Sequence, residues 1–361
     1  MFNRAAIAAF SFLIAADLFG ENPSPAPPKT TPTPTPTAAP TTEQVINSLG
    51  DNDLQSAISL LKSNFTNPES ISDAELNRAT LQGLLLRVPG GLQLLPGKDT
   101  PSSPSAPFYA EIFENHIGYV RLGSLDGANL KELDKKLQDF SAKKVDAVIV
   151  DLRASASGDF ATTAEFAKRF CPKGKALFSV KKPGARQDRS FTSDRDPAFQ
   201  GLIVVLTDIE TAGGAEALAA TLKFYDKALI IGQPSAGRAV EYSDLPLPSG
   251  KIFRVASAEA ILPDNQRLFP GGVKPDLPVE TLLAEKNQMF KLAGEKGMAQ
   301  FVYESERPHM NEAALIAGTN PELDIPDAQR RLRNRDKQPP HDPVLQRALD
   351  VVTSLEIYQK R

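Results

Sequence analysis

The sequence predicts an α/β protein, and two patterns carry the prediction. Between residues 108 and 285, short apolar runs alternate with amphipathic helical segments, which is typical of a layered domain with a largely parallel sheet. Residues 145–150 are apolar except for Asp146, and residues 202–206 are a continuous apolar run, as strands buried on both faces require. A helical segment over 43–96 precedes this domain, and an extension over 286–361 follows it.

The elements follow from periodicity. We expect strands at 117–122, 145–150, 202–206 and 228–231, and helices at 130–140, 162–170 and 212–225. Residues 240–280 are predicted to form shorter strands and turns. In the helical segment, leucines recur at helical spacing, Thr42 is a candidate cap for its first helix, and Pro89-Gly90-Gly91 ends its last. A polar, Pro-rich stretch over 307–343 leads to a final helix over 342–355.

The N-terminus is typical of an export signal. Arg4 precedes an apolar run over 5–16, which small residues follow. Because this run is too short to span a membrane comfortably, we expect residues 1–20 to be a cleaved signal peptide, the alternative being an uncleaved anchor. Residues 21–42 are rich in Pro and Thr and are predicted to be a semi-rigid linker. The expected location is therefore the periplasm or cell envelope.

Composition excludes several kinds of site. The net charge of −3 gives no basic balance, so no nucleic-acid partner is expected. Cys171 is the only cysteine, which excludes an internal disulfide and a cysteine-rich metal site. The three histidines (His116, His309 and His341) are scattered without ligand spacing. We expect neither a metal nor a cofactor.

Five segments in order carry a family resemblance. They are IGYVRLGSL (117–125), VDAVIVDLRASASGD (145–159), GLIVVLTDIETAGGAEALAATL (201–222), KALIIGQPSAGRAVEY (227–242) and ASAEAILPDNQRLFPGGVKPDLPVE (256–280). Together they resemble the tail-specific, or C-terminal-processing, serine peptidases. The resemblance implies a crotonase-like fold for residues 108–285. The loop over 97–107 runs straight into the first strand, so the PDZ domain of many members has no counterpart here.

Two positions depart from the family at its chemistry. When Glu216 is aligned with the family's glutamate, Gly213 falls where the nucleophilic serine belongs, and Arg238 falls where the general-base lysine belongs. Gly213 has no side chain that could attack a carbonyl, and an arginine keeps its proton at any relevant pH. Loss of the nucleophile alone costs a serine peptidase about a million-fold in turnover. The resemblance therefore implies a serine-peptidase fold without catalysis.

The oxyanion turn is altered but partly retained. Ser157 stands in the place of a family glycine, whereas Gly158 is kept. With Gly214 and Arg238, these residues are candidates for binding a peptide carbonyl or a C-terminal carboxylate. The expected partners are peptide or protein C-termini, with an envelope protein as one possibility, and the sequence does not predict an oligomeric state. The alternative for Arg238 is a solvated or structurally paired arginine.

An active enzyme is the alternative function. It would be a serine endopeptidase that cleaves near protein C-termini with a shifted nucleophile, for which Ser235 is the candidate. Serines in turns commonly bond to the local backbone, so a structural role for Ser235 is the competing interpretation. A crotonase-type acyl-CoA enzyme fits the fold class but neither the export signal nor the motifs.

Overall fold

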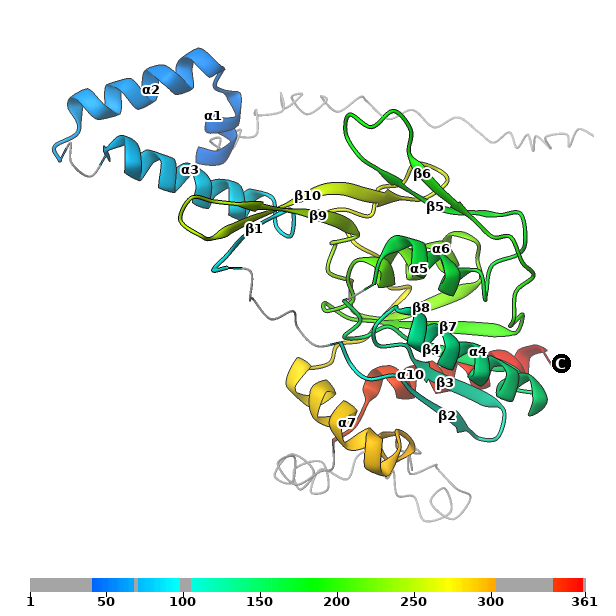
Figure 1. Ribbon diagram of the computed structural model, residues 1–361. Coiled ribbons are helices and arrows are strands. Elements are labelled where there is room, and N and C mark those ends of the chain that lie inside the picture. Colours follow the sequence, from blue (N-terminus) through cyan, green and yellow to red (C-terminus); the bar gives the residue numbers. More distant parts are fainter. Residues whose placement is uncertain (1–40, 68–70, 98–104, 157, 303–339, 360–361) are drawn as a thin grey trace, which may run out of the picture. The chain divides into compact units, whose positions relative to one another are not determined.

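The computed structural model describes residues 41–67, 71–97, 105–156, 158–302 and 340–359 (Figure 1). The predicted signal peptide, nearly all of the linker and Ser157 lie outside these residues. The chain divides between Ser72 and Asp73 into two units, which we describe separately. None of the described helices is long and apolar enough to cross a membrane.

The first unit contains two described helices, α1 (Thr42–Ser48) and α2 (Asp51–Asn64). The cap of α1 is Thr41 rather than Thr42, because the Thr41 hydroxyl accepts from the Gln44 N–H and the Gln44 side chain accepts from the Thr41 N–H. Acidic residues in the first turn of α2 complement the helix dipole.

The second unit begins with α3 (Asp73–Arg87) and β1 (Leu92–Leu95). Both belong to the larger unit, although they lie in the predicted helical segment over 43–96. That segment ends in a strand, because Gly90, at φ 75°, turns the chain and β1 then pairs antiparallel with β10 (Ile252–Ile261). The Ala256 N–H also donates to the Gly91 carbonyl at 2.8 Å.

A six-stranded, largely parallel sheet forms the centre of this unit. Its order is β11-β8-β7-β4-β3-β2, with only β2 antiparallel. The strands are β2 (Tyr109–Phe113), β3 (Ile117–Arg121), β4 (Ala147–Asp151), β7 (Leu202–Thr207), β8 (Ala228–Gly232) and β11 (Leu277–Pro278). The four predicted strands are thus confirmed, and the sheet is parallel where βαβ units were predicted.

Alternate residues of the central strands enter two different cores. Val148 and Val150 of β4 pack with α4 (Gly127–Ala142), α5 (Phe160–Ala167) and α6 (Gly214–Phe224). Ala147 and Ile149 face the other core, which contains α7 (Leu283–Lys296) and α10 (Pro343–Gln359). Helix α7 was not predicted, and it crosses the expected boundary at 285/286. The last helix was predicted and is confirmed.

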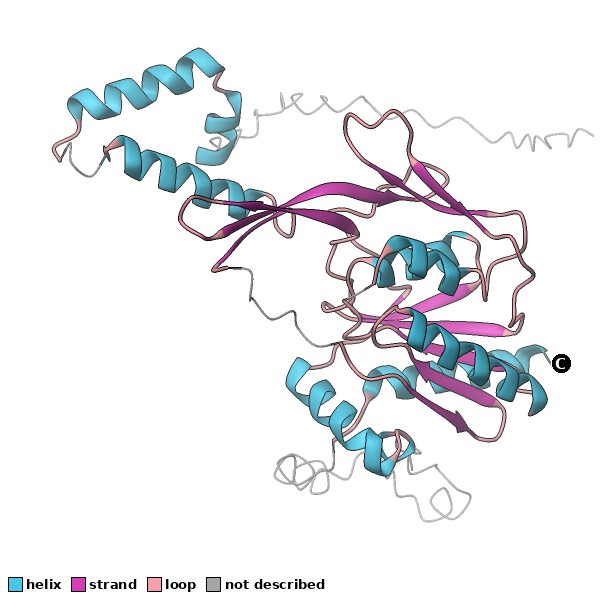
Figure 2. Cartoon of the chain, viewed as in Figure 1, coloured by secondary structure: helices cyan, strands magenta, loops and turns pink. Residues whose placement is uncertain are grey.

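A second, antiparallel sheet completes the layers (Figure 2). It contains β1, β10, β5 (Ala176–Lys181), β6 (Arg189–Thr192) and β9 (Val240–Pro246). Its buried residues Phe178 and Ala260 join the core of α5 and α6, so these helices lie between the two sheets. The layered α/β class is therefore confirmed, although the sequence indicated only separate short strands for part of this sheet.

Candidate functional site

Gly213 lies in a sharp turn between β7 and α6. It is the N-cap of α6, with φ 62° and ψ −123°, a conformation that only glycine adopts readily. A strained strand–turn–helix of this kind exposes the nucleophile in other hydrolases. A Cβ placed on Gly213 would meet nothing closer than the Ala156 carbonyl oxygen, at 3.9 Å. The turn therefore leaves open space in the place of a side chain.

The turn after β4 faces this space. The Ala212 N–H donates to the Ser155 carbonyl at 2.9 Å, which joins the turn to the residue before Gly213. Ala154 and Gly158 both have positive φ, 57° and 129°. A Cβ on Gly158 would lie 2.7 Å from the Cβ of Leu125, so this position requires glycine. The structure thus brings Gly158 and Gly213 to the same end of the sheet.

Glu216 joins the segments of the candidate site. Its Oε1 accepts from the Ser235 hydroxyl and the Gly237 N–H, both at 2.6 Å. Its Oε2 accepts from the Arg238 N–H at 2.7 Å and the Gly213 N–H at 3.1 Å. Burial raises the pKa of this carboxyl, and the four hydrogen bonds oppose that rise. Because two N–H groups share Oε2, Gly213 and Arg238 are close neighbours.

The Ser235 hydroxyl is fully engaged. It donates to Glu216 and accepts from the Val273 N–H at 2.7 Å. Within the described chain, no histidine, lysine or arginine side chain forms a hydrogen bond with it. A hydroxyl that donates to a buried carboxylate and accepts from a backbone amide bridges two turns, which is the structural role weighed above.

The Arg238 side chain is half-buried against the turn between α3 and β1. Its Cγ lies 2.7 Å from the position that a Cβ on Gly90 would take, and the Gly90 carbonyl accepts from the Tyr242 hydroxyl at 2.6 Å. Burial raises the pKa of Tyr242, and the positive charge of Arg238 opposes that rise. In the described part of the protein, the guanidinium has no hydrogen bond or ion pair. The Gly90 turn is thus a wall of the site that the sequence did not predict.

Glu216 was also missed as a functional residue, since it served only to align the segment. A signal was available: an acidic residue three positions after a helix cap is typical of a capping box. Here the cap is glycine, which has no side chain, so only the hydrogen bond from the cap N–H to the Glu216 carboxylate is present. The same carboxylate also accepts from the turn at 235–238.

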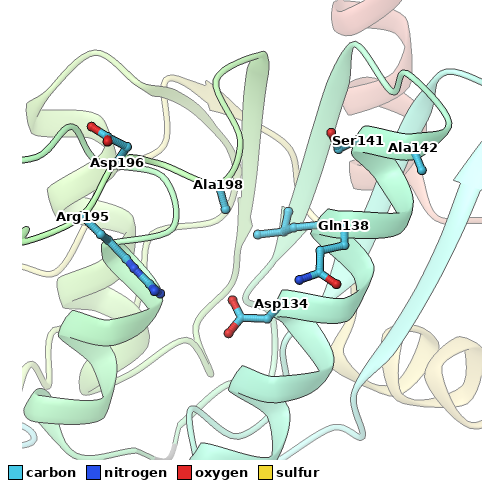
Figure 3. Close-up of a pocket in the computed structure, with 8 residues that line it drawn as sticks. Asp134, Gln138, Ser141, Ala142, Arg195, Asp196 and Ala198 are labelled. Carbon is cyan, nitrogen blue, oxygen red and sulfur yellow. The ribbon is translucent and has the colours of Figure 1, made fainter.

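A separate groove of about 610 Å³ lies between α4 and the segment before β7 (Figure 3). Arg195 extends towards Asp134 there, and Asp134 already accepts from Arg169 at 2.8 and 2.9 Å. No residue of the candidate site lines this groove. Across the described ranges, no group of three or more His, Cys, Asp or Glu side chains is placed to hold a metal ion.

Comparison with known proteins identifies the domain. Residues 116–279 match the model of peptidase family S41. A carboxyl-terminal-processing protease of Synechocystis is 27% identical over 164 residues, which cover 45% of this chain and 38% of that protein. The carboxy-terminal processing protease CtpA of Bacillus subtilis is 23% identical over 297 residues, covering 73% and 61%. The matched residues therefore span less than two thirds of the length of either relative.

A solved structure shares the layered fold. A candidate peptidase from Parabacteroides merdae superposes with a TM-score of 0.50 at 16% identity, covering 67% of this chain and 85% of that one. The S41 match contains the turns after β4 and β7 and the turn at 235–238, which together form the candidate site. Residues 116–279 therefore form a domain that is similar to peptidase family S41.

Proposed function

We propose that this S41 domain binds peptide or protein C-termini without hydrolysing them. The observation that carries the proposal is Gly213, which the resemblance places at the family's nucleophile and which leaves open space at the start of α6. Glycine offers no hydroxyl for attack on a carbonyl. The similarity to peptidases supports a peptide as the ligand, and the residue at 213 argues against its cleavage.

Arg238 supports the same conclusion, because it stands where the family has its general base. The resemblance places it at the lysine that would deprotonate the nucleophile, and a guanidinium cannot take up a proton at neutral pH. A guanidinium is well suited to grip a carboxylate through two parallel hydrogen bonds. In the described chain its donors are unused, so an anionic ligand would not have to displace a partner.

Backbone donors complete the proposed binding site. The N–H groups of Gly158 and Gly214 have no hydrogen-bond acceptor among the described residues, and Gly214 opens α6. Free N–H groups at a helix start favour an anion or a carbonyl oxygen. A C-terminal carboxylate could accept from these groups and from Arg238 together.

The alternative, an active peptidase that uses Ser235, has less support. Its hydroxyl donates to Glu216, a buried carboxylate that already accepts three backbone N–H groups. Attack by Ser235 would require this network to open and a base to take the proton. The one described side chain that accepts from this hydroxyl is Glu216, and its carboxylate is already occupied by the three backbone N–H groups.

Fluorescence anisotropy with a labelled peptide tests the binding. We expect the wild type to bind the peptide with a free C-terminal carboxylate and to bind its C-terminally amidated form much more weakly. Arg238→Ala should weaken binding of the free acid by about 1.5–3 kcal/mol, the value of a charged hydrogen bond. The matched control Arg186→Ala, at an exposed position, should have no effect. Equal affinity for the acid and the amide would contradict the proposal.

We further propose that the protein is exported to the periplasm or cell envelope. Support comes from Arg4 and the apolar run over 5–16, in the order of a signal peptide. Intact-mass measurement of the protein recovered outside the cytoplasm should show that the first 20 residues or so have been removed. Recovery of the protein with Met1 or Phe2 retained would count against cleavage.

A further inference from the structure

A network of buried charges lies beside the candidate site, at the carboxyl ends of β4 and β7. Its members are at most 3% exposed and comprise two cations and three carboxylates: Arg153, Lys286, Asp151, Asp208 and Asp342. Two of them come from outside the S41 match, since Lys286 lies on α7 and Asp342 lies immediately before α10. Charges buried to this degree require partners of opposite sign with good geometry.

Arg153 connects the turn after β4 to α10. Its guanidinium donates two parallel hydrogen bonds to Asp342, both at 2.8 Å, and also donates to Asp151 at 2.7, 3.0 and 3.1 Å. Asp342 in turn caps α10, because its Oδ1 accepts from the Val344 and Leu345 N–H groups. Arg153 thus fixes the start of the turn after β4 against the start of α10.

Asp208 holds both turns at once. Its Oδ1 accepts from the Ala154 N–H at 3.2 Å and from the Thr211 N–H at 3.0 Å, two residues before Gly213. Its Oδ2 accepts from the Lys286 ammonium group of α7, which also donates to Glu210 at 2.6 Å. One carboxylate therefore sets the spacing between the two turns, and α7 supplies its counter-charge.

We propose that Asp342 and Lys286 are positioning residues, through which α10 and α7 hold the two turns of the candidate site in place. The proposal rests on the proposed function for what the site binds, but the placement of the turns can be measured separately. Removal of one partner from a buried pair leaves an uncompensated charge, which the protein relieves by local opening. The turns at 152–156 and 208–214 are the parts that should open.

Hydrogen exchange followed by mass spectrometry tests this in the full chain. Asp342→Asn and Lys286→Met should each raise amide exchange about tenfold over 152–156 and 208–214, with less than about a twofold change in α4. Lys286→Arg keeps the charge and should restore protection. The exposed residues Asp350 and Lys291 provide matched controls, as Asp350→Asn and Lys291→Met, which should leave these turns unchanged.

Peptide affinity gives the second measurement. At a temperature where every variant is folded, Asp342→Asn and Lys286→Met should weaken binding of the free-acid peptide about tenfold, whereas Lys286→Arg should not. If Asp342→Asn does not fold, the comparison of Lys286→Met with Lys286→Arg tests the proposal by itself. Unchanged exchange in both turns, with only a fall in melting temperature, would overturn the proposal. If the wild type binds no peptide, the proposed function fails, and the exchange data alone still decide this inference.

Discussion

Glu216→Gln is the most informative single substitution, because Gln keeps the volume and replaces one acceptor oxygen by a donor group. All four groups that contact Glu216 donate to it: the Ser235 hydroxyl and the N–H groups of Gly213, Gly237 and Arg238. The amide nitrogen of Gln must therefore face at least one donor. The substitution tests whether this carboxylate holds the segments of the site together.

The magnitude follows from the two orientations of the amide. With nitrogen in place of Oε2, the Gly213 and Arg238 N–H groups both lose their acceptor. With nitrogen in place of Oε1, the Ser235 hydroxyl can rotate and accept, so the Gly237 N–H is the only backbone donor left without an acceptor. The second orientation is the cheaper one, and an unsatisfied buried donor costs about 1–3 kcal/mol. Removal of the charge returns part of the desolvation penalty that raises the pKa of Glu216, so we expect a net loss of about 1–2 kcal/mol.

Urea unfolding at neutral pH measures this loss as a lower midpoint with an unchanged slope. Glu285→Gln, in the exposed first turn of α7, is the matched control and should change stability by less than about 0.5 kcal/mol. Glu216→Gln should also weaken binding of the free-acid peptide, since the turn that carries Arg238 loses an anchor. A stability equal to that of the wild type would refute the role assigned to Glu216.

Three further predictions concern neighbouring positions. Gly213→Ser should cost about 1–3 kcal/mol of stability in urea unfolding, because the φ of 62° at this position suits only glycine. The variant should not cleave peptides, because the guanidinium of Arg238 cannot take the proton from the new serine. Cleavage by this single variant would contradict the assignment of Arg238. Gly90→Ala should displace the Arg238 side chain and weaken binding of the free-acid peptide selectively; equal weakening for the amidated peptide would contradict this. Burial would raise the pKa of Asp342, but Arg153 holds this pKa below its usual value. The contribution of Asp342 to folding stability is therefore present above the unfolded pKa of about 3.9 and is lost as pH falls through the lower folded pKa. Asp342→Asn should therefore flatten the loss of stability below about pH 5, unlike Asp350→Asn, and an unchanged acid limb would contradict this.

The sequence predicted four strands of the central sheet because each of them is defined locally, whereas β2 was not predicted. Residues 147–150 and 202–206 are apolar throughout, and the strands β4 and β7 lie there with both faces buried. The antiparallel sheet was harder to predict, since β1 and β10 pair across more than 150 residues of sequence. Such pairing is a property of the fold rather than of either segment.

In the candidate site, too, local features could be predicted from the sequence and contacts between distant segments could not. The helix expected over 212–225 is confirmed as α6, because its apolar periodicity is a local signal, and Gly213 is its cap. The Gly90 wall and the links to α7 and α10 join distant segments, for which a single sequence contains no pattern. Lys286 and Asp342 look like ordinary charged residues of an extension until the fold buries them next to Asp208 and Arg153.

Incubation of the purified full chain with an excess of a free-acid peptide, followed over days by mass spectrometry, tests the central claim most directly. The account predicts that the mass of the peptide does not change while anisotropy of the same sample shows it bound. Ser235→Ala should leave the peptide equally intact. It should change peptide binding only as far as loss of the Ser235 hydrogen bonds weakens the turn. Progressive cleavage near the peptide C-terminus by the unmodified protein, abolished by Ser235→Ala, would contradict the account and identify Ser235 as a working nucleophile.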